Sequence, residues 1–420
     1  MKDYTQEKID ILNNINDQAK QLYDNHDYVG AIKCFEQIPE KDFPEEFKSN
    51  LSKCYYHNQQ ASKAIDLLSS CKFSDVGMDY TDFQLDMAIY KNAIGNFNFA
   101  LEVYENLDQS DSRVRFNIGW HMMRKGKFKE AFKLLECGSQ CRAWGHEYIH
   151  LENKKIDSQK RWDGKPTKTL LLFLEGGFGD CLIFLRWASY LRTFCEKLII
   201  TAPIQLCRLL SNAGYEVTSD NMIPILEYDH YIPGMSIPNF IDVEHPLDKV
   251  TLPYIKSISE PYITRGMDIL SSTNKLKIGV RWMGNQKFEH DQFRSIPKEK
   301  FYNLTHYGSL FSLQLEESED DDHFIPCRHI IKDWQDTYSV FSGLDLLVTS
   351  CTSTAHLAGA MNIPTIVIVP LVCYFVWAND DLRWYDSVTV VRQNQYGDWS
   401  GAIEEMYKLV ESFSNKYSKD

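Results

Sequence analysis

The chain has 420 residues, of which 44% are hydrophobic, 25% charged and 13% aromatic. This length exceeds what one ordinary core organises, so we expect two or three globular domains rather than a disordered chain. A formal net charge of −13 disfavours nonspecific binding to nucleic acid or to an anionic membrane, because both need a positive surface field.

The opening segment, MKDYTQEKIDILNNIND, carries charges where a secretory signal needs an apolar core. No later segment reaches the roughly 18 to 20 apolar residues of a spanning helix. We therefore expect a cytoplasmic protein without a membrane span. Its eleven cysteines are scattered without a CxxC pair, which favours reduced, mostly buried thiols over a zinc site or a disulfide set.

The first 150 residues repeat a pattern in which a turn precedes an amphipathic helix with an alanine near its start. The four copies are NHDYVGAIKCFEQI, NQQASKAIDLLSSC, IGNFNFALEVYENL and KGKFKEAFKLLECG, with alanines at Ala31, Ala64, Ala100 and Ala131. Their spacings of 33, 36 and 31 residues bracket the period of about 34 in TPR repeats. The pattern resembles a TPR array and predicts a helical solenoid over residues 1–150.

Such an array has two readings that the residues leave open. It presents a concave surface to a protein partner or to an acceptor, or it is a scaffold that packs against the rest of the chain. In either case the small alanines let neighbouring helix pairs approach closely.

After a polar link the pattern changes to short apolar strands that alternate with helices. LLLFL, the glycine turn EGGFGD, a helical stretch and KLIITA form one βαβ unit, and KLKIGV, LDLLVTS, STAHLAGAMN and IPTIVIVP form a second one. We predict two Rossmann-like, doubly wound domains over 165–265 and 275–400, followed by a closing amphipathic helix and tail over 401–420. The fold class is α plus α/β.

The glycine turn lacks the Lys-Ser/Thr of a P-loop and the spacing of a dinucleotide fingerprint. Its glycines, Gly176, Gly177 and Gly179, shape a loop directly after a strand, and Asp180 opens the following helix. Asp180 is either an N-cap or a carboxylate aimed at the cleft where ligands of α/β sheets bind.

The strings LEGGFGDCLIFLRWASYL, GVRWMGNQKFEHDQFRSIP and DWQDTYSVFSGLDLLVTSCTSTAHLAGAMNIPTIVIVP follow one another as in a known family. They resemble TPR proteins whose C-terminal half belongs with the heptosyltransferases, glycosyltransferase family nine. The resemblance covers nearly the whole chain. It implies a GT-B fold, an acceptor-binding first domain and a nucleotide-sugar-binding second domain, and inverting sugar transfer without a metal or other cofactor.

The resemblance also suggests roles for individual residues. Asp180 matches the family's aspartate in the first glycine loop, which would act as the catalytic base. Arg294 would lie near the donor phosphates, and Ser353, Thr354 and His356 open a helix that would meet the phosphate or the sugar. Simpler readings remain for each: a surface ion pair for Arg294, helix caps for Ser353 and Thr354, and packing for His356.

One departure from the family pattern bears on function. Where many members have an acidic residue in a V-D-T segment, this chain reads TSCTST over residues 349–354. The alternative to an active enzyme is therefore a noncatalytic TPR scaffold with a degenerate GT-B half. A separate acidic segment, LEESEDDDH over 315–323, is expected to be a solvated loop, with cation binding as its alternative.

Overall fold

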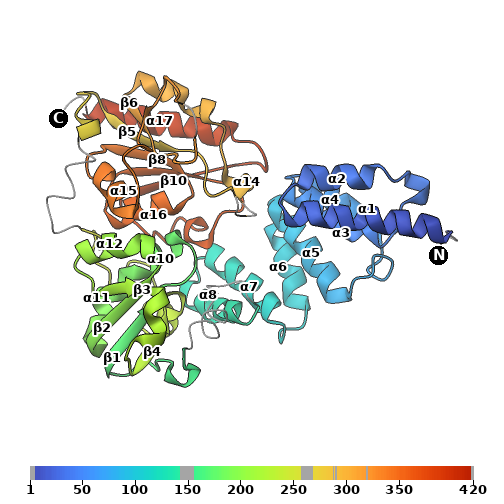
Figure 1. Cartoon of the computed structure of the whole chain (residues 1–420), viewed down its shortest axis with the longest axis horizontal. Helices are drawn as coiled ribbons and strands as arrows, with labels where there is room; N and C mark the ends of the chain where they lie inside the picture. Colours follow the sequence, from blue (N-terminus) through green and yellow to red (C-terminus); the bar gives the residue numbers. More distant parts are fainter. Residues whose placement is uncertain are drawn as a thin grey trace. The chain divides into compact units, whose positions relative to one another are not determined.

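The computed structural model describes residues 5–141, 156–256, 268–286, 288, 291–317 and 320–417. The chain forms two compact units. The first comprises Met1–Gln109, Asn285–Phe293 and Gln395–Asp398, and the second comprises Ser110–Gly284, Arg294–Asn394 and Trp399–Asp420. Figure 1 labels most of the helices and strands of the two units.

The first unit is helical, and its helices pack as consecutive pairs. They are α1 (Gln6–Asp24), α2 (Tyr28–Glu36), α3 (Phe47–His57), α4 (Ala61–Ser69), α5 (Tyr80–Ala93) and α6 (Phe97–Asn106). Each odd-numbered helix contacts the next even-numbered one, and α2 contacts α3 as α4 contacts α5. Ala31, Ala64 and Ala100 lie in the even-numbered helices and are completely buried. The periodic alanines therefore occupy the contacts between helices, where a larger side chain would separate them.

A fourth helical pair belongs to the second unit. It consists of α7 (Ser112–Arg124) and α8 (Phe128–Leu135). Phe132 of α8 packs against Phe184 and Phe375, at centroid distances of 6.2 and 6.0 Å. Ala131, the last of the four periodic alanines, is also buried in this core. This pair repeats the sequence pattern of the first three, but its apolar face lies in the α/β core.

The second unit contains two parallel sheets. The first has the order β3-β2-β1-β4, and the second has the order β10-β9-β8-β5-β6-β7. The strands are β1 (Thr167–Phe173), β2 (Cys195–Ala202), β3 (Val217–Ser219), β4 (His230–Pro233), β5 (Lys277–Arg281), β6 (Ser309–Ser312), β7 (Ile325–Pro326), β8 (Leu346–Ser350), β9 (Thr365–Val369) and β10 (Val388–Arg392). The prediction of two parallel α/β domains is confirmed.

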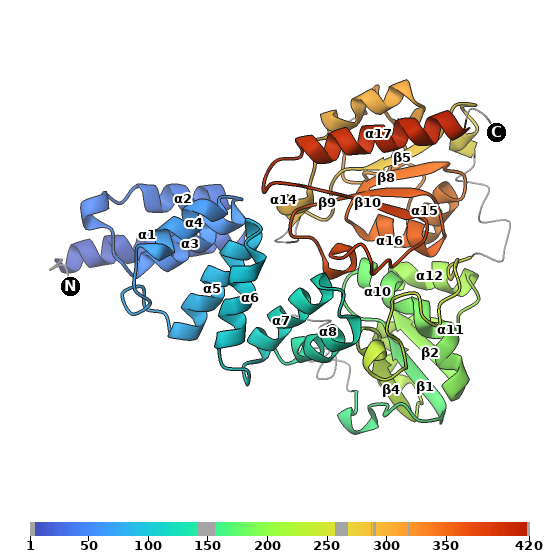
Figure 2. The same cartoon turned by 180° about the vertical axis from the view of Figure 1, so that it is seen from behind.

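Helices accompany both sheets. They are α10 (Phe178–Phe184), α11 (Ala188–Leu191), α12 (Ile204–Asn212), α15 (Trp334–Phe341), α16 (Ser353–Ala360) and α17 (Ser400–Tyr417). The short helix α14 (Asp291–Arg294) belongs to the first unit up to Phe293, and its last residue, Arg294, begins a segment of the second unit. Figure 2 shows α17 along one face of the six-stranded sheet and α16 on the opposite face. The closing helix that we expected near the end of the chain is therefore present.

Alternate residues of the strands pack on opposite faces of each sheet. In β9, Val367 and Val369 join the core that contains α16, whereas Ile366 and Ile368 join the core that contains α17. A strand that is buried on both faces has no position for a polar alternation, and this explains the continuous apolar runs in the sequence.

In the part of the chain that the structure describes, no helix combines the length and the apolar character needed to cross a membrane. All eleven cysteines lie in that part and are free, and seven of them are buried. The expectation of unpaired, mostly buried thiols is confirmed.

Candidate functional site

Both sheets reverse the direction of their winding at one point. In the first sheet β1 lies between β2 and β4, and in the second β5 lies between β6 and β8. At such a switch point the connections leave the strand ends in opposite directions, so ligands of α/β proteins bind beyond the carboxyl ends there. The predicted site residues follow β1, β5 and β8, which are three of the four strands that flank these points.

The glycine loop after β1 folds around the carboxylate of Asp180. The backbone N–H of Gly177 donates to Asp180 Oδ2 at 2.9 Å, which closes the start of α10. Gly176 has a positive φ of 84°, and a side chain there would meet Asp180 Oδ2 and Met235 Cε at 2.9 Å. Glycine is required at this position by its backbone conformation and by space. The N-cap residue of α10 is Gly177, so the expectation that Asp180 itself is the N-cap was wrong: Asp180 lies in the first turn and accepts from the N-cap backbone.

The other carboxylate oxygen of Asp180, Oδ1, accepts a hydrogen bond from the second α/β domain. The hydroxyl of Tyr374, five residues after β9, donates to Asp180 Oδ1 at 2.6 Å. Burial raises the pKa of Asp180, while the hydrogen bonds from Tyr374 and Gly177 and the charge of Arg294 oppose that rise. Asp180 is thus a half-buried carboxylate with both oxygens held in fixed directions.

The start of α16 lies against the same glycine loop. A Cβ atom added to Gly179 would meet His356 Cδ2 at 3.1 Å and Ser353 Cα at 3.6 Å. The absent side chain of Gly179 therefore allows the loop after β1 and the helix after β8 to touch. The structure brings Asp180 together with the predicted residues of α16.

The two hydroxyl residues at the start of α16 differ in their surroundings. Thr354 is buried, and its hydroxyl lies 3.1 Å from that of Thr349 and 2.6 Å from that of Thr352. Ser353 is only half-buried. The Thr354 hydroxyl is therefore occupied by this internal network, and Ser353 is the more accessible of the two.

His356 is buried within aromatic side chains. Its Nδ1 lies 3.2 Å from the hydroxyl of Tyr385, and its ring stacks on Trp377 with centroids 4.9 Å apart. Burial, and then the charges of Arg186 and Arg294, lower its pKa to about 3. The imidazole is therefore neutral at physiological pH and is packed as the simpler reading of this residue expected.

Arg294 is the last residue of α14 and reaches the loop after β8. Its Nη1 donates to the carbonyl of Cys351 at 3.0 Å. Its charge is close enough to lower the pKa of both Asp180 and His356. The guanidinium thus lies at the switch point of the second sheet, between the connections that follow β5 and β8.

Sequence reasoning missed Tyr374 and Glu175. Glu175 is buried, and its carboxylate accepts from the backbone N–H groups of Gly234 and Met235 at 3.2 and 3.3 Å. It joins the connections after β1 and β4 at the switch point. Both residues lie just beyond the ends of strands, and their position after a predicted strand could have marked them as candidate site residues.

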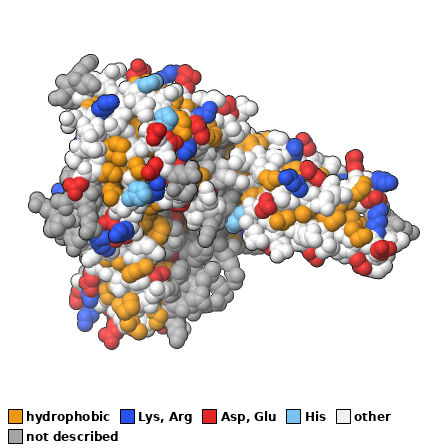
Figure 3. Space-filling view, turned by 45° about the horizontal axis from the view of Figure 1, so that its top comes forward, with side chains coloured by type: hydrophobic (Ala, Val, Ile, Leu, Met, Phe, Trp, Pro, Cys, Tyr) orange, Lys and Arg blue, Asp and Glu red, His pale blue; other side chains and the backbone are white. Residues whose placement is uncertain are grey.

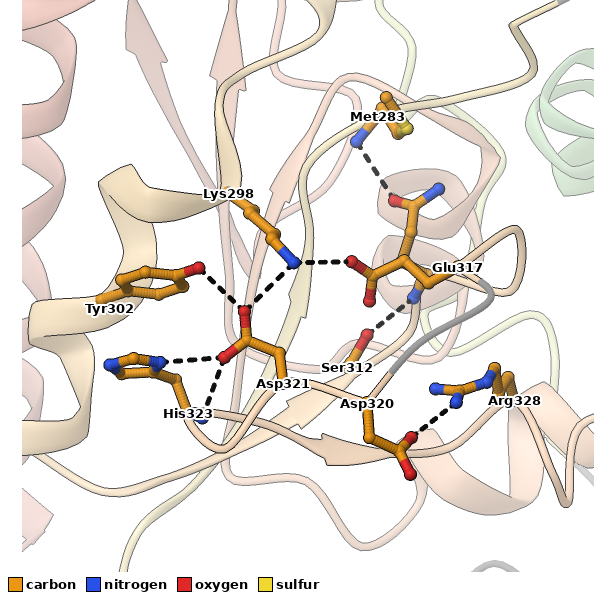
Figure 4. Close-up of polar contacts among 10 residues, drawn as sticks. Met283, Lys298, Tyr302, Ser312, Glu317, Asp320, Asp321, His323 and Arg328 are labelled. Carbon is orange, nitrogen blue, oxygen red and sulfur yellow. Dashed lines mark hydrogen bonds and ion pairs between the residues drawn. The ribbon is translucent and has the colours of Figure 1, made fainter.

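In the acidic segment 315–323, of which residues 318 and 319 lie outside the described part of the chain, Glu317, Asp320 and Asp321 form ion pairs with the chain's own cations (Figure 4). Asp321 accepts from Tyr302 and from His323, and it lies 3.1 Å from Lys298. Burial disfavours its charge, but these hydrogen bonds outweigh burial and hold the pKa of Asp321 well below its usual range. Among the described residues, no group of His, Cys, Asp or Glu has the arrangement of a metal site.

Hydrophobic side chains are visible among charged ones on the surface of the helical unit (Figure 3). Large exposed examples are Ile11, Val29, Phe73 and Tyr80. Single exposed apolar residues are ordinary on soluble proteins, so they do not identify a partner surface.

No family model and no curated protein matches this chain. Among solved structures, it is similar to a glycosyl transferase family 9 protein from Veillonella parvula DSM 2008, with a TM-score of 0.42 and 11% identity over 61% of this chain and 99% of that one. It is similar to E. coli ADP-heptose lps heptosyltransferase II, with a TM-score of 0.42 and 11% identity over 59% and 99%. A Thermobaculum terrenum O-GlcNAc transferase mutant gives a TM-score of 0.34 and 8% identity over 99% and 94%. At such low scores we infer neither the fold nor the function from these likenesses.

Proposed function

We propose that the chain is a glycosyltransferase that moves a sugar from a nucleotide-sugar donor to an acceptor hydroxyl. The observation that carries the proposal is the meeting of Asp180 with the start of α16, through the contact of Gly179 with His356 and Ser353. This contact joins a carboxylate at one switch point to an arginine and a helix N-terminus at the other. Sugar transfer needs this combination: a base for the acceptor and positive groups for the departing diphosphate.

In the proposed reaction, the acceptor oxygen attacks the anomeric carbon on the face opposite the diphosphate. The bond between that carbon and the diphosphate oxygen breaks, and the electron pair leaves with the nucleoside diphosphate. Asp180 takes the acceptor proton, and the anomeric configuration inverts. A carboxylate has about four lone-pair positions, so the bonds from Gly177 and Tyr374 leave room for an acceptor hydroxyl.

The donor phosphates would lie beside Arg294 and the first turn of α16. Ser353 is the accessible hydroxyl there. Thr352, the N-cap residue of α16, makes no side-chain capping bond, so the first backbone N–H groups other than that of Ala355, which donates to the Thr352 carbonyl, can donate to an anion. His356 would support the loop as a neutral ring. We propose metal-independent transfer because the fixed positive groups take the place of a divalent ion at the leaving group.

The first test is a thermal-shift screen of the purified chain with ADP-, GDP-, UDP-, CMP- and dTDP-sugars. A donor at 100 times its dissociation constant stabilises the folded state by about 2.7 kcal/mol. We expect one nucleotide class to raise the melting temperature, Arg294→Ala to abolish the rise, and Arg113→Ala to keep it. Arg113 is the matched control because it is a half-exposed arginine that pairs with Asp111 at the start of α7.

Turnover is then measured as release of the nucleoside diphosphate with the donor that binds. Asp180→Asn should keep the thermal shift and lose about 10²- to 10⁴-fold in rate. A folded wild type that binds none of the five donor classes would contradict the proposal and favour the noncatalytic scaffold.

A further inference from the structure

Tyr374 reaches Asp180 from the opposite α/β domain. Asp180 follows β1 of the four-stranded sheet, and Tyr374 lies in the connection after β9 of the six-stranded sheet. Their hydrogen bond of 2.6 Å joins residues 194 positions apart in the chain. The carboxylate that the first domain supplies is therefore oriented in part by the second.

The Tyr374 ring is fixed independently of that bond. It packs edge-on against Trp120 of α7, with centroids 5.5 Å apart, and against Phe375 at 4.3 Å. A ring held on two sides directs its hydroxyl to one place. This packing thus constrains the position of the hydroxyl independently of its hydrogen bond to Asp180.

We propose that Tyr374 is a positioning residue that holds Asp180 ionised and correctly oriented by donating a hydrogen bond across the two α/β domains. This inference rests on the proposed role of Asp180 as the base. With the Gly177 amide on Oδ2 and the Tyr374 hydroxyl on Oδ1, the carboxylate has one orientation, and its remaining lone pairs point to fixed directions.

The protonation states around the pair are consistent with this role. Burial, followed by the negative charge of Asp180, keeps the pKa of Tyr374 well above its usual value, so the phenol stays a donor. Burial also raises the pKa of Cys181 on α10 and of Tyr385 beyond β9, so both stay neutral. His356 of α16 is neutral; the charge of Arg294 lowers the pKa of Asp180, and the charge of Arg186 lowers the pKa of His356 and opposes the rise in that of Tyr385.

The direction in which the pKa of Asp180 should change follows from the hydrogen bond that Tyr374 donates. A hydrogen bond to the charged form of a carboxyl group favours that form, so its loss raises the pKa. Tyr374→Phe keeps the ring and its packing against Trp120 but removes the donor. We expect the titration midpoint of Asp180 to rise by about one pH unit.

The measurement is a titration of the full chain, labelled with ¹³C at the aspartate carboxyl carbons. The Asp180 signal is assigned by its loss in Asp180→Asn. Tyr302→Phe is the matched control, since Tyr302 likewise donates to a carboxylate, Asp321, at 2.8 Å, and stacks on His323. It should move the Asp321 signal and leave that of Asp180 unchanged.

A second variant guards against a packing effect. Tyr374→Met fills the space without a hydroxyl, and it must also move the Asp180 midpoint upward. An unchanged or lowered midpoint in the Tyr374 variants, or an equal rise in Tyr302→Phe, would overturn the inference.

This titration needs neither donor nor turnover, so it separates the two proposals. If the wild type turns over a donor, the acidic limb of its pH–rate profile should move upward in Tyr374→Phe by the same amount as the titration midpoint, with the KM for the donor unchanged. A wild type without turnover would refute the proposed transferase and leave the coupling of Tyr374 to Asp180 measurable. Turnover with an unmoved midpoint would refute only the role of Tyr374.

Discussion

At the scale of single residues, the buried His356 of α16 makes the stability of the fold depend on pH. His356 is 5% exposed, bonded to Tyr385 and stacked on Trp377. Its pKa falls from 6.5 in the unfolded chain to about 3 in the fold. Between these two values the unfolded state binds a proton that the folded state does not, so the fold loses stability as pH falls.

We predict that His356 alone makes the free energy of unfolding fall by about 1.4 kcal/mol for each pH unit between about pH 6.5 and about pH 3. His356→Gln should be less stable than wild type at neutral pH, and the difference should shrink as the pH is lowered. The check is urea unfolding across this range, with exposed His329→Gln as the control. Parallel stability curves for wild type and His356→Gln would refute the prediction.

At the scale of secondary-structure elements, the placement of α16 depends on a glycine that the sequence did not single out. Gly359 lies against the ring of Tyr385, and a Cβ atom there would come within 2.4 Å of Cγ and Cδ1. Tyr385 is 1% exposed and is itself packed against Trp377 and Arg186. The ring has no free space to move into, so glycine at this position sets the distance of α16 from its neighbours.

We predict that Gly359→Ala destabilises the α/β unit by about 1–3 kcal/mol, because overpacking a rigid core forces side chains out of their rotamers. Gly401→Ala in α17 is the matched control, since its nearest neighbour is the flexible amide end of Asn394. Gly401→Ala should leave the free energy of unfolding, measured with denaturant, almost unchanged. Equal effects of the two substitutions would show that the space beside Tyr385 does not matter.

The helix after the glycine loop differs from its predicted form. The stretch CLIFLRWASYLRTF has helical spacing throughout, but the structure divides it into α10, a 3₁₀ turn over Leu185–Trp187, α11, and a second 3₁₀ turn over Arg192–Phe194. Arg186 is buried, and its Nε donates to the carbonyl of Ile183 at 2.9 Å, while its Nη1 donates to the carbonyls of Pro246 and Trp384. A buried guanidinium needs hydrogen-bond acceptors, and Arg186 finds them in backbone carbonyls. The spacing of apolar residues in the sequence does not indicate this requirement.

At the scale of the whole molecule, the boundary between helical and α/β parts does not follow the repeat. The fourth pair, α7–α8, shares its core with both sheets, whereas Phe35 of α2 lies in a separate core of the first helices. A repeat unit must bury its apolar face, and for this pair the face meets the α/β core.

We therefore predict that Phe132→Ala destabilises the α/β unit by about 3–5 kcal/mol. Amide hydrogen exchange should then accelerate in the strands of both sheets as well as in α7 and α8. In the control, Phe35→Ala should accelerate exchange in α1 to α3 without affecting the sheets. If Phe132→Ala accelerated amide exchange only in helices, α8 would be energetically part of the helical repeats and not of the α/β core.

The sequence alone determined the features that depend on local spacing. Apolar runs buried on both faces identified the parallel strands, the buried alanines marked the helix contacts, and glycines after a strand marked the loop that holds Asp180. Each of these follows from the geometry of one element and its immediate neighbours.

Which of these features meet depends on contacts between segments that are far apart in the chain. Tyr374 lies 194 positions from Asp180, and the contact of Gly179 with His356 joins two different sheets. The same packing left Ser353 accessible while it enclosed Thr354, although the two are neighbours in the sequence. Contacts between distant segments depend on how the sheets face each other, and the spacing of residues along the chain contains no record of that arrangement.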